Sequence, residues 1–207
     1  PPSFERLLQS PVLEASFGGG EANVAVSLAC FGVDVAYVTV LPDNPIADAC
    51  IADLRRAGVD VSCIVRGSGR MGLYYLEPGA NQRPSRVIYD RAGSAIANAP
   101  PGSLDWDRIF AGASWFHITP AISPSAAELS LEALRKAREK GLTISCDYNN
   151  RGKLWKYGKA ATEVMPEIVR LADIGIANEE DCQKALGISV EAEAGWMGDV
   201  EAGKLDI

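Results

Sequence analysis

The chain has 207 residues, of which 47% are hydrophobic and 23% are charged, so it can bury a sizeable apolar core within one domain. Its net charge of −7 at pH 7 argues against nucleic acid or an anionic membrane as the main partner. The five cysteines are scattered and form no C-x-x-C pair, which favours a reducing cytoplasm. No uninterrupted apolar stretch is long enough for a membrane-spanning helix.

The first predicted elements are a glycine-rich turn and a helix. Three consecutive glycines precede a helical pattern in which Val24, Leu28 and Phe31 share one stripe, and Gly32 lies just past its end. This pattern predicts that the three apolar side chains form the buried face of the helix. A buried strand is expected at residues 35–40.

The next segment contains a helix and then a change of character. Asn44 and Pro45 are typical of a helix start, and Gly58 is typical of a helix end. Three short β-prone runs follow, at residues 61–65, 72–77 and 86–90. Because no helix separates them, we expect them to pair antiparallel as a small appended sheet, an insert of about residues 59–91.

Beyond residue 105 strands and helices alternate. The predicted strands are residues 115–118, 142–147 and 174–177, and the predicted helices are residues 123–140, 159–171 and 179–186. Such alternation indicates an α/β domain with a parallel sheet covered on both faces. Ligands of these folds bind beyond the carboxyl ends of the strands. That rule places the glycine turn and the residues that follow each strand along one rim.

The glycine turn, Gly18–Gly20, is the first candidate site. Glycines at a helix start allow backbone N–H groups to approach a ligand oxygen, and Asn23 adds an amide. The spacing matches neither the dinucleotide fingerprint nor the phosphate loop of nucleotide hydrolases. The alternative is a tight turn between strand and helix with an exposed Asn23.

The insert offers a second candidate. Residues two apart on a strand share a face, so Tyr89 and Arg91 can point at one ligand, and Tyr74 on a neighbouring strand can join them. Two phenols and a guanidinium suit a hydroxylated carboxylate. The alternative is a solvated edge strand.

Two polar segments follow the later strands. Asp147–Arg151 ends a buried strand, where Asp147 could bind a ligand or cap the turn. Asn178–Asp181 begins a helix and could serve as an ordinary N-cap with an acidic first turn. His117, the only histidine, lies in an apolar run and is expected to be a strand residue with its hydrogen bonds satisfied. It leaves no zinc-ligand set, no Cys–His pair and no Ser–His–Asp triad.

The order of these motifs is specific. GGGEANVAVSLACFG, GLYYLE, RVIYDRAGSAIA, WFHITPAIS, SCDYNNRGKLW and IANEEDCQKALG together resemble the 2-keto-3-deoxygluconate kinases, a group of ribokinase-like carbohydrate kinases of the phosphofructokinase B type. The resemblance runs from about Phe17 to Gly187. It implies a three-layer α/β sandwich with a mostly parallel central sheet and a small antiparallel β lid. The implied reaction is transfer of the ATP γ-phosphoryl group to 2-keto-3-deoxygluconate.

The resemblance also assigns site residues. The substrate site would comprise Gly19, Gly20, Glu21, Ala22, Asn23, Tyr74, Tyr89, Arg91 and Arg151. The ATP site would comprise Asn149, Asn150, Arg151 and Asn178. The cofactors implied are ATP and Mg²⁺, with Asp181, in place of the family's Glu, holding the metal through water. A homo-oligomer formed through the lid is also implied.

Three features depart from the family pattern. The family's catalytic Asp stands in a later G-A-G-D turn that has no counterpart here, the family's first strand is missing, and about three residues are absent after His117. We therefore expect residues 1–207 to be a partial kinase domain that lacks the C-terminal nucleotide-binding part and its catalytic base. By themselves they should phosphorylate nothing.

Other functions remain open at this point. A kinase of the same fold for a neutral sugar or a nucleoside would leave Arg91 and Arg151 without an anion. A non-catalytic sugar-binding or assembly fragment would fit the absent base, but so short a piece would have an exposed sheet edge. A nicotinamide-dependent dehydrogenase lacks its fingerprint.

Overall fold

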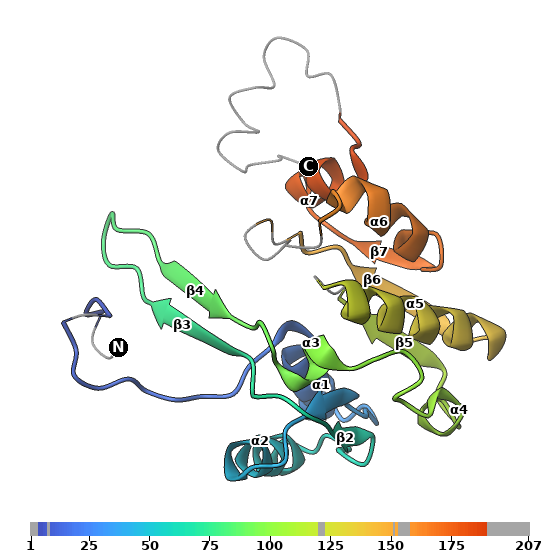
Figure 1. The fold of residues 1–207 in the computed structure, drawn as a ribbon, viewed down its shortest axis with the longest axis horizontal. Coiled ribbons are helices and arrows are strands. Elements are labelled where there is room, and N and C mark those ends of the chain that lie inside the picture. Colours follow the sequence, from blue (N-terminus) through green and yellow to red (C-terminus); the bar gives the residue numbers. More distant parts are fainter. Residues whose placement is uncertain (1–3, 8, 120–122, 151, 153–157, 190–207) are drawn as a thin grey trace.

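The structure is a computed structural model that describes residues 4–7, 9–119, 123–150, 152 and 158–189 (Figure 1). Helices and strands alternate through most of it, as the sequence predicts. The strands form two parallel sheets and one antiparallel ribbon. The parallel sheets confirm the α/β class.

The first parallel sheet is a β–α–β unit. Strand β1 (Thr39–Leu41) and strand β2 (Ile64–Arg66) pair in parallel, with helix α2 (Pro45–Arg56) between them along the chain. Asn44 caps α2 by accepting a 2.9 Å hydrogen bond from the amide of Ala47. The expectation that residues 61–65 pair antiparallel with the insert is wrong. The helix that precedes them serves as the crossover that a parallel pair requires.

Helix α1 (Gly20–Cys30) has a different buried face from the one expected. Val24 is 36% exposed and Phe31 is 83% exposed, whereas Ala25 is only 4% exposed. The helix packs through small side chains against Leu54 of α2 and Val59, in the apolar cluster beneath it. Ala22, Ala25 and Ala29 supply small side chains to this cluster, whereas Val24 and Phe31 stay exposed. The prediction of a buried Val24–Leu28–Phe31 stripe is therefore wrong.

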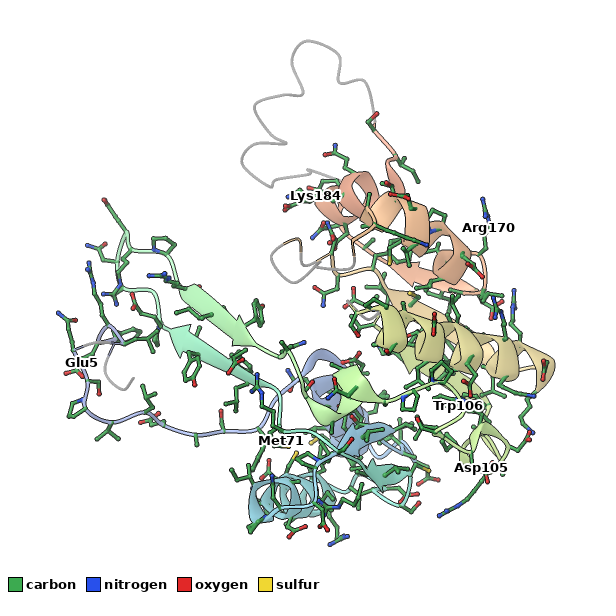
Figure 2. The ribbon with its side chains drawn as sticks, in the orientation of Figure 1. Glu5, Met71, Asp105, Trp106, Arg170 and Lys184 are labelled. Atoms are coloured by element: carbon green, nitrogen blue, oxygen red, sulfur yellow. The ribbon has the colours of Figure 1, made fainter. Side chains whose placement is uncertain are left out.

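The antiparallel ribbon projects from the body of the molecule (Figure 1). It consists of β3 (Leu73–Glu77) and β4 (Arg86–Asp90), in register Leu73↔Asp90. This pairing was expected from the sequence. Figure 2 shows side chains extending from the ribbon beyond Met71 at its base.

The N-terminal arm, residues 4–7 and 9–19, runs from the far end of the ribbon to the start of α1 (Figure 1). The amide of Leu7 donates to Glu77 Oε2 over 3.2 Å. A guanidinium N–H of Arg83 donates to the carbonyl of Phe4 over 2.5 Å. Glu5 lies at the same end (Figure 2). The arm thus connects the ribbon to the glycine turn.

The second parallel sheet has strand order β5–β6–β7, formed by Trp115–Ile118, Thr143–Asp147 and Ile174–Ile176. The helices of this half are α3 (Ala95–Asn98), α4 (Trp106–Ile109), α5 (Pro124–Glu139), α6 (Ala161–Val169) and α7 (Glu179–Leu186). Ser123 caps α5, and Gly187 ends α7 in the left-handed conformation at φ 70°. The predicted order of elements is confirmed here.

The main core lies between this sheet and its helices. Ile144 on β6, Leu134 on α5 and Ile168 on α6 are fully buried, and each contributes about 1.5–3 kcal/mol by leaving water. Among the described residues the opposite face of the sheet is open, because Trp115 is 54% exposed and Ile176 is 50% exposed. All three strands run the same way, so their carboxyl ends form one rim.

Candidate functional site

The glycine turn lies between the ribbon and the end of β5. A Cβ atom at position 18 would lie 3.1 Å from the hydroxyl of Tyr74, and one at position 20 would lie 3.6 Å from the hydroxyl of Thr119. Gly19, at φ 155°, adopts a conformation that side chains rarely allow. The backbone of Gly18 thus lies close to the Tyr74 hydroxyl, and Gly19 is favoured by its conformation.

The start of α1 is suited to an oxygen ligand. No side chain among the described residues caps it, so its first N–H groups point past Gly19 without a side-chain partner. The amide oxygen of Asn23 lies 3.8 Å from the Cβ position of Gly18, on the same side as Tyr74. Ala22 packs its methyl group into the apolar cluster beneath α1, so only its backbone faces a ligand.

The ribbon presents one face to the turn. Tyr74 and Tyr89 are directly paired across β3 and β4, so both phenols lie on that face. The guanidinium carbon of Arg91 lies 5.3 Å from the ring centre of Tyr89, within the range of a cation–π contact. The structure therefore brings Tyr74 to the predicted glycine turn, with Tyr89 beside it on the ribbon and Arg91 over the Tyr89 ring.

Tyr37 belongs to the same neighbourhood, although the sequence analysis did not select it. Burial raises the pKa of Tyr37 to about 12, and the nearby carboxylate of Glu21 acts in the same direction. Arg91 and a hydrogen bond with Thr39 act in the opposite direction. Tyr37 lies in an apolar run that indicates a strand and nothing more. The signal that could have found it is the spacing of Tyr37 and Thr39, two hydroxyls on one face of that run.

Thr119 is the second residue that sequence reasoning missed. It follows β5 directly, at the rim, with its hydroxyl facing Gly20. The sequence placed the residues that follow each strand on this rim but did not single out Thr119 as a ligand. Residues 120–122 lie outside the described part of the chain.

The predicted ATP residues lie farther along the rim. Asn149 has φ 31°, a conformation that is uncommon outside glycine and typical of functional turns. The backbone amide of Asn150 donates to Asp181 Oδ1 over 2.7 Å, which joins the turn after β6 to α7. Arg151 lies outside the described residues.

Asn178 and Asp181 cap α7 reciprocally. The amide of Asp181 donates to Asn178 Oδ1 over 2.8 Å, and the amide of Asn178 donates to Asp181 Oδ2 over 3.4 Å. The interpretation as an ordinary N-cap is thus confirmed. Their roles toward ATP and Mg²⁺ stay predictions.

Several other kinds of site are not formed by the described residues. They contain no group of three His, Cys, Asp or Glu side chains that could hold a metal ion, and no helix long and apolar enough to cross a membrane. Burial raises the pKa of the Cys146 thiol to about 12, so it stays protonated and is a poor nucleophile. His117 Nδ1 lies 2.8 Å from Ser145 Oγ, which confirms the prediction of a satisfied strand histidine.

Several proteins with similar sequences or structures are named as 2-dehydro-3-deoxygluconokinases or 2-dehydro-3-deoxygalactonokinases. A 2-dehydro-3-deoxygalactonokinase of Haloferax volcanii is 34% identical over 208 residues, covering 100% of this chain and 64% of its own length. A 2-dehydro-3-deoxygluconokinase of Bacillus subtilis is 28% identical over 160 residues, covering 75% of this chain and 49% of its own length. The crystal structure of the 2-dehydro-3-deoxygluconokinase of Thermotoga maritima superposes with a TM-score of 0.87 at 45% identity, covering 93% of this chain and 60% of that one.

The chain thus spans about three-fifths of the length of such relatives. The superposition confirms the ribokinase-like fold expected from the motifs. A family profile described as pfkB family carbohydrate kinase matches residues 4–198, which is nearly the whole sequence. The chain therefore belongs to the pfkB family of carbohydrate kinases.

Proposed function

We propose that the protein transfers the γ-phosphoryl group of ATP to the primary hydroxyl of 2-keto-3-deoxygluconate or of its galactonate-derived epimer. In this proposal the chain supplies the sugar-binding half and the lid. The observation that carries it is the enclosure of Gly18–Gly20 by hydroxyls from two sides, Tyr74 of the ribbon and Thr119 of the rim. Names of the relatives in Haloferax volcanii and Thermotoga maritima support the substrate class.

The sugar acid would be held by groups of three kinds. Backbone N–H groups at the start of α1 would donate to its oxygens. Tyr74, Tyr89 and Thr119 would pair with its hydroxyls. Arg91, together with Arg151, would bind its carboxylate through charged hydrogen bonds. A protein with a net charge of −7 needs such a local positive cluster to attract an anion.

ATP would occupy the rim beyond β6 and β7. Asn149, Asn150 and Asn178 would face it, and the phosphoryl group would pass toward the sugar beside the glycine turn. Mg²⁺, when bound, would neutralise phosphate charge during transfer. Asp181 fits a contact through water, because among the described residues its carboxylate accepts one amide hydrogen bond on each oxygen, from Asn150 and Asn178, and each carboxylate oxygen has a further lone pair.

The test is an assay of the protein expressed from its complete reading frame in a host without competing sugar kinases. Phosphorus NMR should show ATP-dependent formation of a phosphate monoester on 2-keto-3-deoxygluconate or its galactonate-derived epimer. Fructose and ribose should be poor substrates. A preference for a neutral sugar, as the name of the fructokinase relative in Oryza sativa suggests for that protein, would overturn the substrate class.

A second copy of the chain is the partner we propose for the ribbon. The face away from the glycine turn carries Leu73, Tyr75 and Ile88, which are 43%, 37% and 40% exposed. Apolar side chains on an open ribbon favour burial against another protein. Sedimentation velocity should find a dimer, and Ile88→Glu should shift it toward the monomer. A cytoplasmic location is part of the same proposal, supported by the five free cysteines.

A further inference from the structure

Gly175 lies in the middle of β7, and the proposed site gives it no role. A glycine inside a strand weakens the strand, and it marks a bulge, a bend or the close approach of another group. Here another group approaches. A Cβ atom at position 175 would lie 2.7 Å from the ring carbon Cζ of Tyr148 and 3.2 Å from its Cε1. The ring of Tyr148 therefore occupies the space that a side chain at position 175 would fill.

The ring lies on the helix-covered face of the sheet. Cys146 and Gly175 are partners in the register of β6 and β7, so their side-chain positions share one face. Cys146 is completely buried in the main core, which identifies that face. The amide of Tyr148 donates to the carbonyl of Ile176 over 2.9 Å and so continues the ladder. Tyr148, two residues after Cys146, thus faces the same way and packs against the main core.

The chain that follows Tyr148 is the turn that we propose to face ATP. Asn149 has φ 31°, and a residue other than glycine keeps such a conformation only where its surroundings hold it. On one side the turn is tied to α7, because the amide of Asn150 donates to Asp181 Oδ1 over 2.7 Å. On the other side it is tied to β7 through Tyr148.

The part of Tyr148 that this geometry uses is the ring. Burial raises the pKa of the Tyr148 phenol, so the hydroxyl carries no charge toward a phosphate at neutral pH. A phenylalanine at this position would keep both ring carbons that lie over Gly175. A smaller side chain would leave the space over Gly175 empty.

We propose that Tyr148 is a positioning residue for the nucleotide, whose ring rests on Gly175 and fixes the Asn149–Asn150 turn relative to the start of α7. This inference rests on the proposed function for its ligand, ATP. Tyr148 would act through the turn and would not touch the nucleotide. The glycine turn, which would bind the sugar, is formed by other elements and does not depend on this contact.

Thermal unfolding tests the contact itself, without any assay of activity. The variants Gly175→Ala, Tyr148→Ala and their combination form a cycle with the parent protein, all expressed from the complete reading frame. Gly175→Ala should displace the ring and lower Tm. Its Tm loss should largely disappear when Tyr148 is already alanine, because the space is then vacant. Additive Tm losses would overturn the inference, whatever the enzyme phosphorylates.

Steady-state kinetics tests the positioning role. Tyr148→Ala should raise KM for ATP about 3- to 10-fold, which corresponds to the weakening of one neutral hydrogen bond to the ligand, and should leave KM for the sugar acid unchanged. Gly175→Ala should raise KM for ATP similarly, and the double variant should be no worse. Tyr148→Phe should behave like the parent. The inference is wrong if Tyr148→Ala raises both KM values alike or neither, or if Tyr148→Phe is equally impaired.

A core variant and a binding measurement complete the test. Ile168→Val alters the same main core without touching the turn, so it should lower Tm and leave both KM values unchanged. Calorimetric titration with a non-hydrolysable ATP analogue and Mg²⁺ measures nucleotide binding without a sugar. A parent protein that binds the analogue but phosphorylates only a neutral sugar would overturn the proposed substrate and keep this inference. A Tyr148→Ala variant that binds the analogue as tightly as the parent would overturn this inference and keep the proposed function.

Discussion

The ribbon and the helix-covered sheet are built in opposite ways from similar apolar residues. In the helix-covered sheet, Ile144 on β6 and Leu134 on α5 are completely buried in the main core. In the ribbon, Tyr74 and Leu76 are 41% and 44% exposed on the face toward the glycine turn. The sheet is held by its core, whereas the ribbon is held by one strand pair and by hydrogen bonds to the arm.

This difference shows where stability lies and supports the ribbon as the place where we propose that the substrate is recognised. Segments with few buried contacts open at low free-energy cost, and ligand-binding lids belong to them. The rim of the sheet supplies fixed points such as Thr119 and the capped start of α7. A substrate bound at the turn would contact one rigid side and one movable side. Each of the following predictions tests that division.

Replacement of Leu134 by Ala should have the largest effect on stability. Leu134 is fully buried at the centre of the main core, so its truncation leaves a cavity and should lower the free energy of unfolding by about 2–5 kcal/mol. Urea denaturation measures it. Leu76→Ala in the ribbon is the matched control and should cost less than about 1 kcal/mol, because Leu76 is already 44% exposed. Equal losses in the free energy of unfolding at the two positions would contradict the difference between the buried core and the exposed ribbon.

The proposed carboxylate clamp, formed by Arg91 and Arg151 around the substrate carboxylate, should have the next largest effect. Arg91→Met and Arg151→Met should each raise KM for the sugar acid about 10- to 100-fold, since a hydrogen bond between charged groups contributes about 1.5–3 kcal/mol. Arg151, which sequence resemblance places near the phosphates, should also lower kcat, whereas Arg91 on the movable side should act mainly on KM. Steady-state kinetics on the protein from its complete reading frame measures both.

The control for the clamp is an analogue without the carboxylate. Both substitutions should raise KM less for this analogue than for the acid, because the analogue has no anion that is left unpaired. If either variant discriminates the acid from the analogue as well as the parent does, that arginine is not part of the clamp. If Arg91→Met lowers kcat as much as Arg151→Met, the functional difference between lid and rim disappears.

Stability at alkaline pH tests whether the phenol of Tyr37 is buried beneath the site. The pKa of Tyr37 is raised to about 12, chiefly by burial and next by Glu21, with Cys50 also raising it and Arg91 lowering it. The folded protein therefore keeps this proton above pH 10, where an unfolded tyrosine loses it. The stability from this group is complete below about pH 10 and is lost as the pH approaches 12. Between these pH values the free energy of unfolding of Tyr37→Phe, measured by urea titration, should therefore fall by about 2 kcal/mol less than that of the parent. Identical pH dependence would show that Tyr37 is solvated like the ribbon.

The sequence predicted the structural features that depend on neighbouring residues in the chain. Asn44, Ser123 and Asn178 are capping residues whose function depends on the next three residues, and all three act as caps in the structure. Alternation of strands and helices was likewise sufficient for the parallel sheets. Tyr74 could be connected to the glycine turn only through family resemblance, because the contact joins segments more than fifty residues apart.

The errors have a common physical origin. Helical spacing alone could not show that α1 packs through Ala25 and not through Val24 and Phe31, because the choice depends on where Leu54 and Val59 pack against the helix. Nor could the apolar run around Tyr37 reveal that its phenol is buried where the charges of Glu21 and Arg91 act on it. Both features depend on tertiary neighbours, which a local pattern does not encode.

The smallest expected effect concerns Asn178, which belongs to the rigid region by structure and to the ATP site by resemblance. Asn178→Ala removes the side chain that accepts the hydrogen bond from the Asp181 amide, and it should lower the free energy of unfolding by about 1 kcal/mol. Asn178→Ser keeps a capping oxygen and should recover most of that loss. If Asn178 also contacts ATP, both variants should raise KM for ATP, because neither retains the amide. If Asn178→Ser restores stability and KM together, Asn178 is only a cap, and the rim at this point supports the fold without binding the nucleotide.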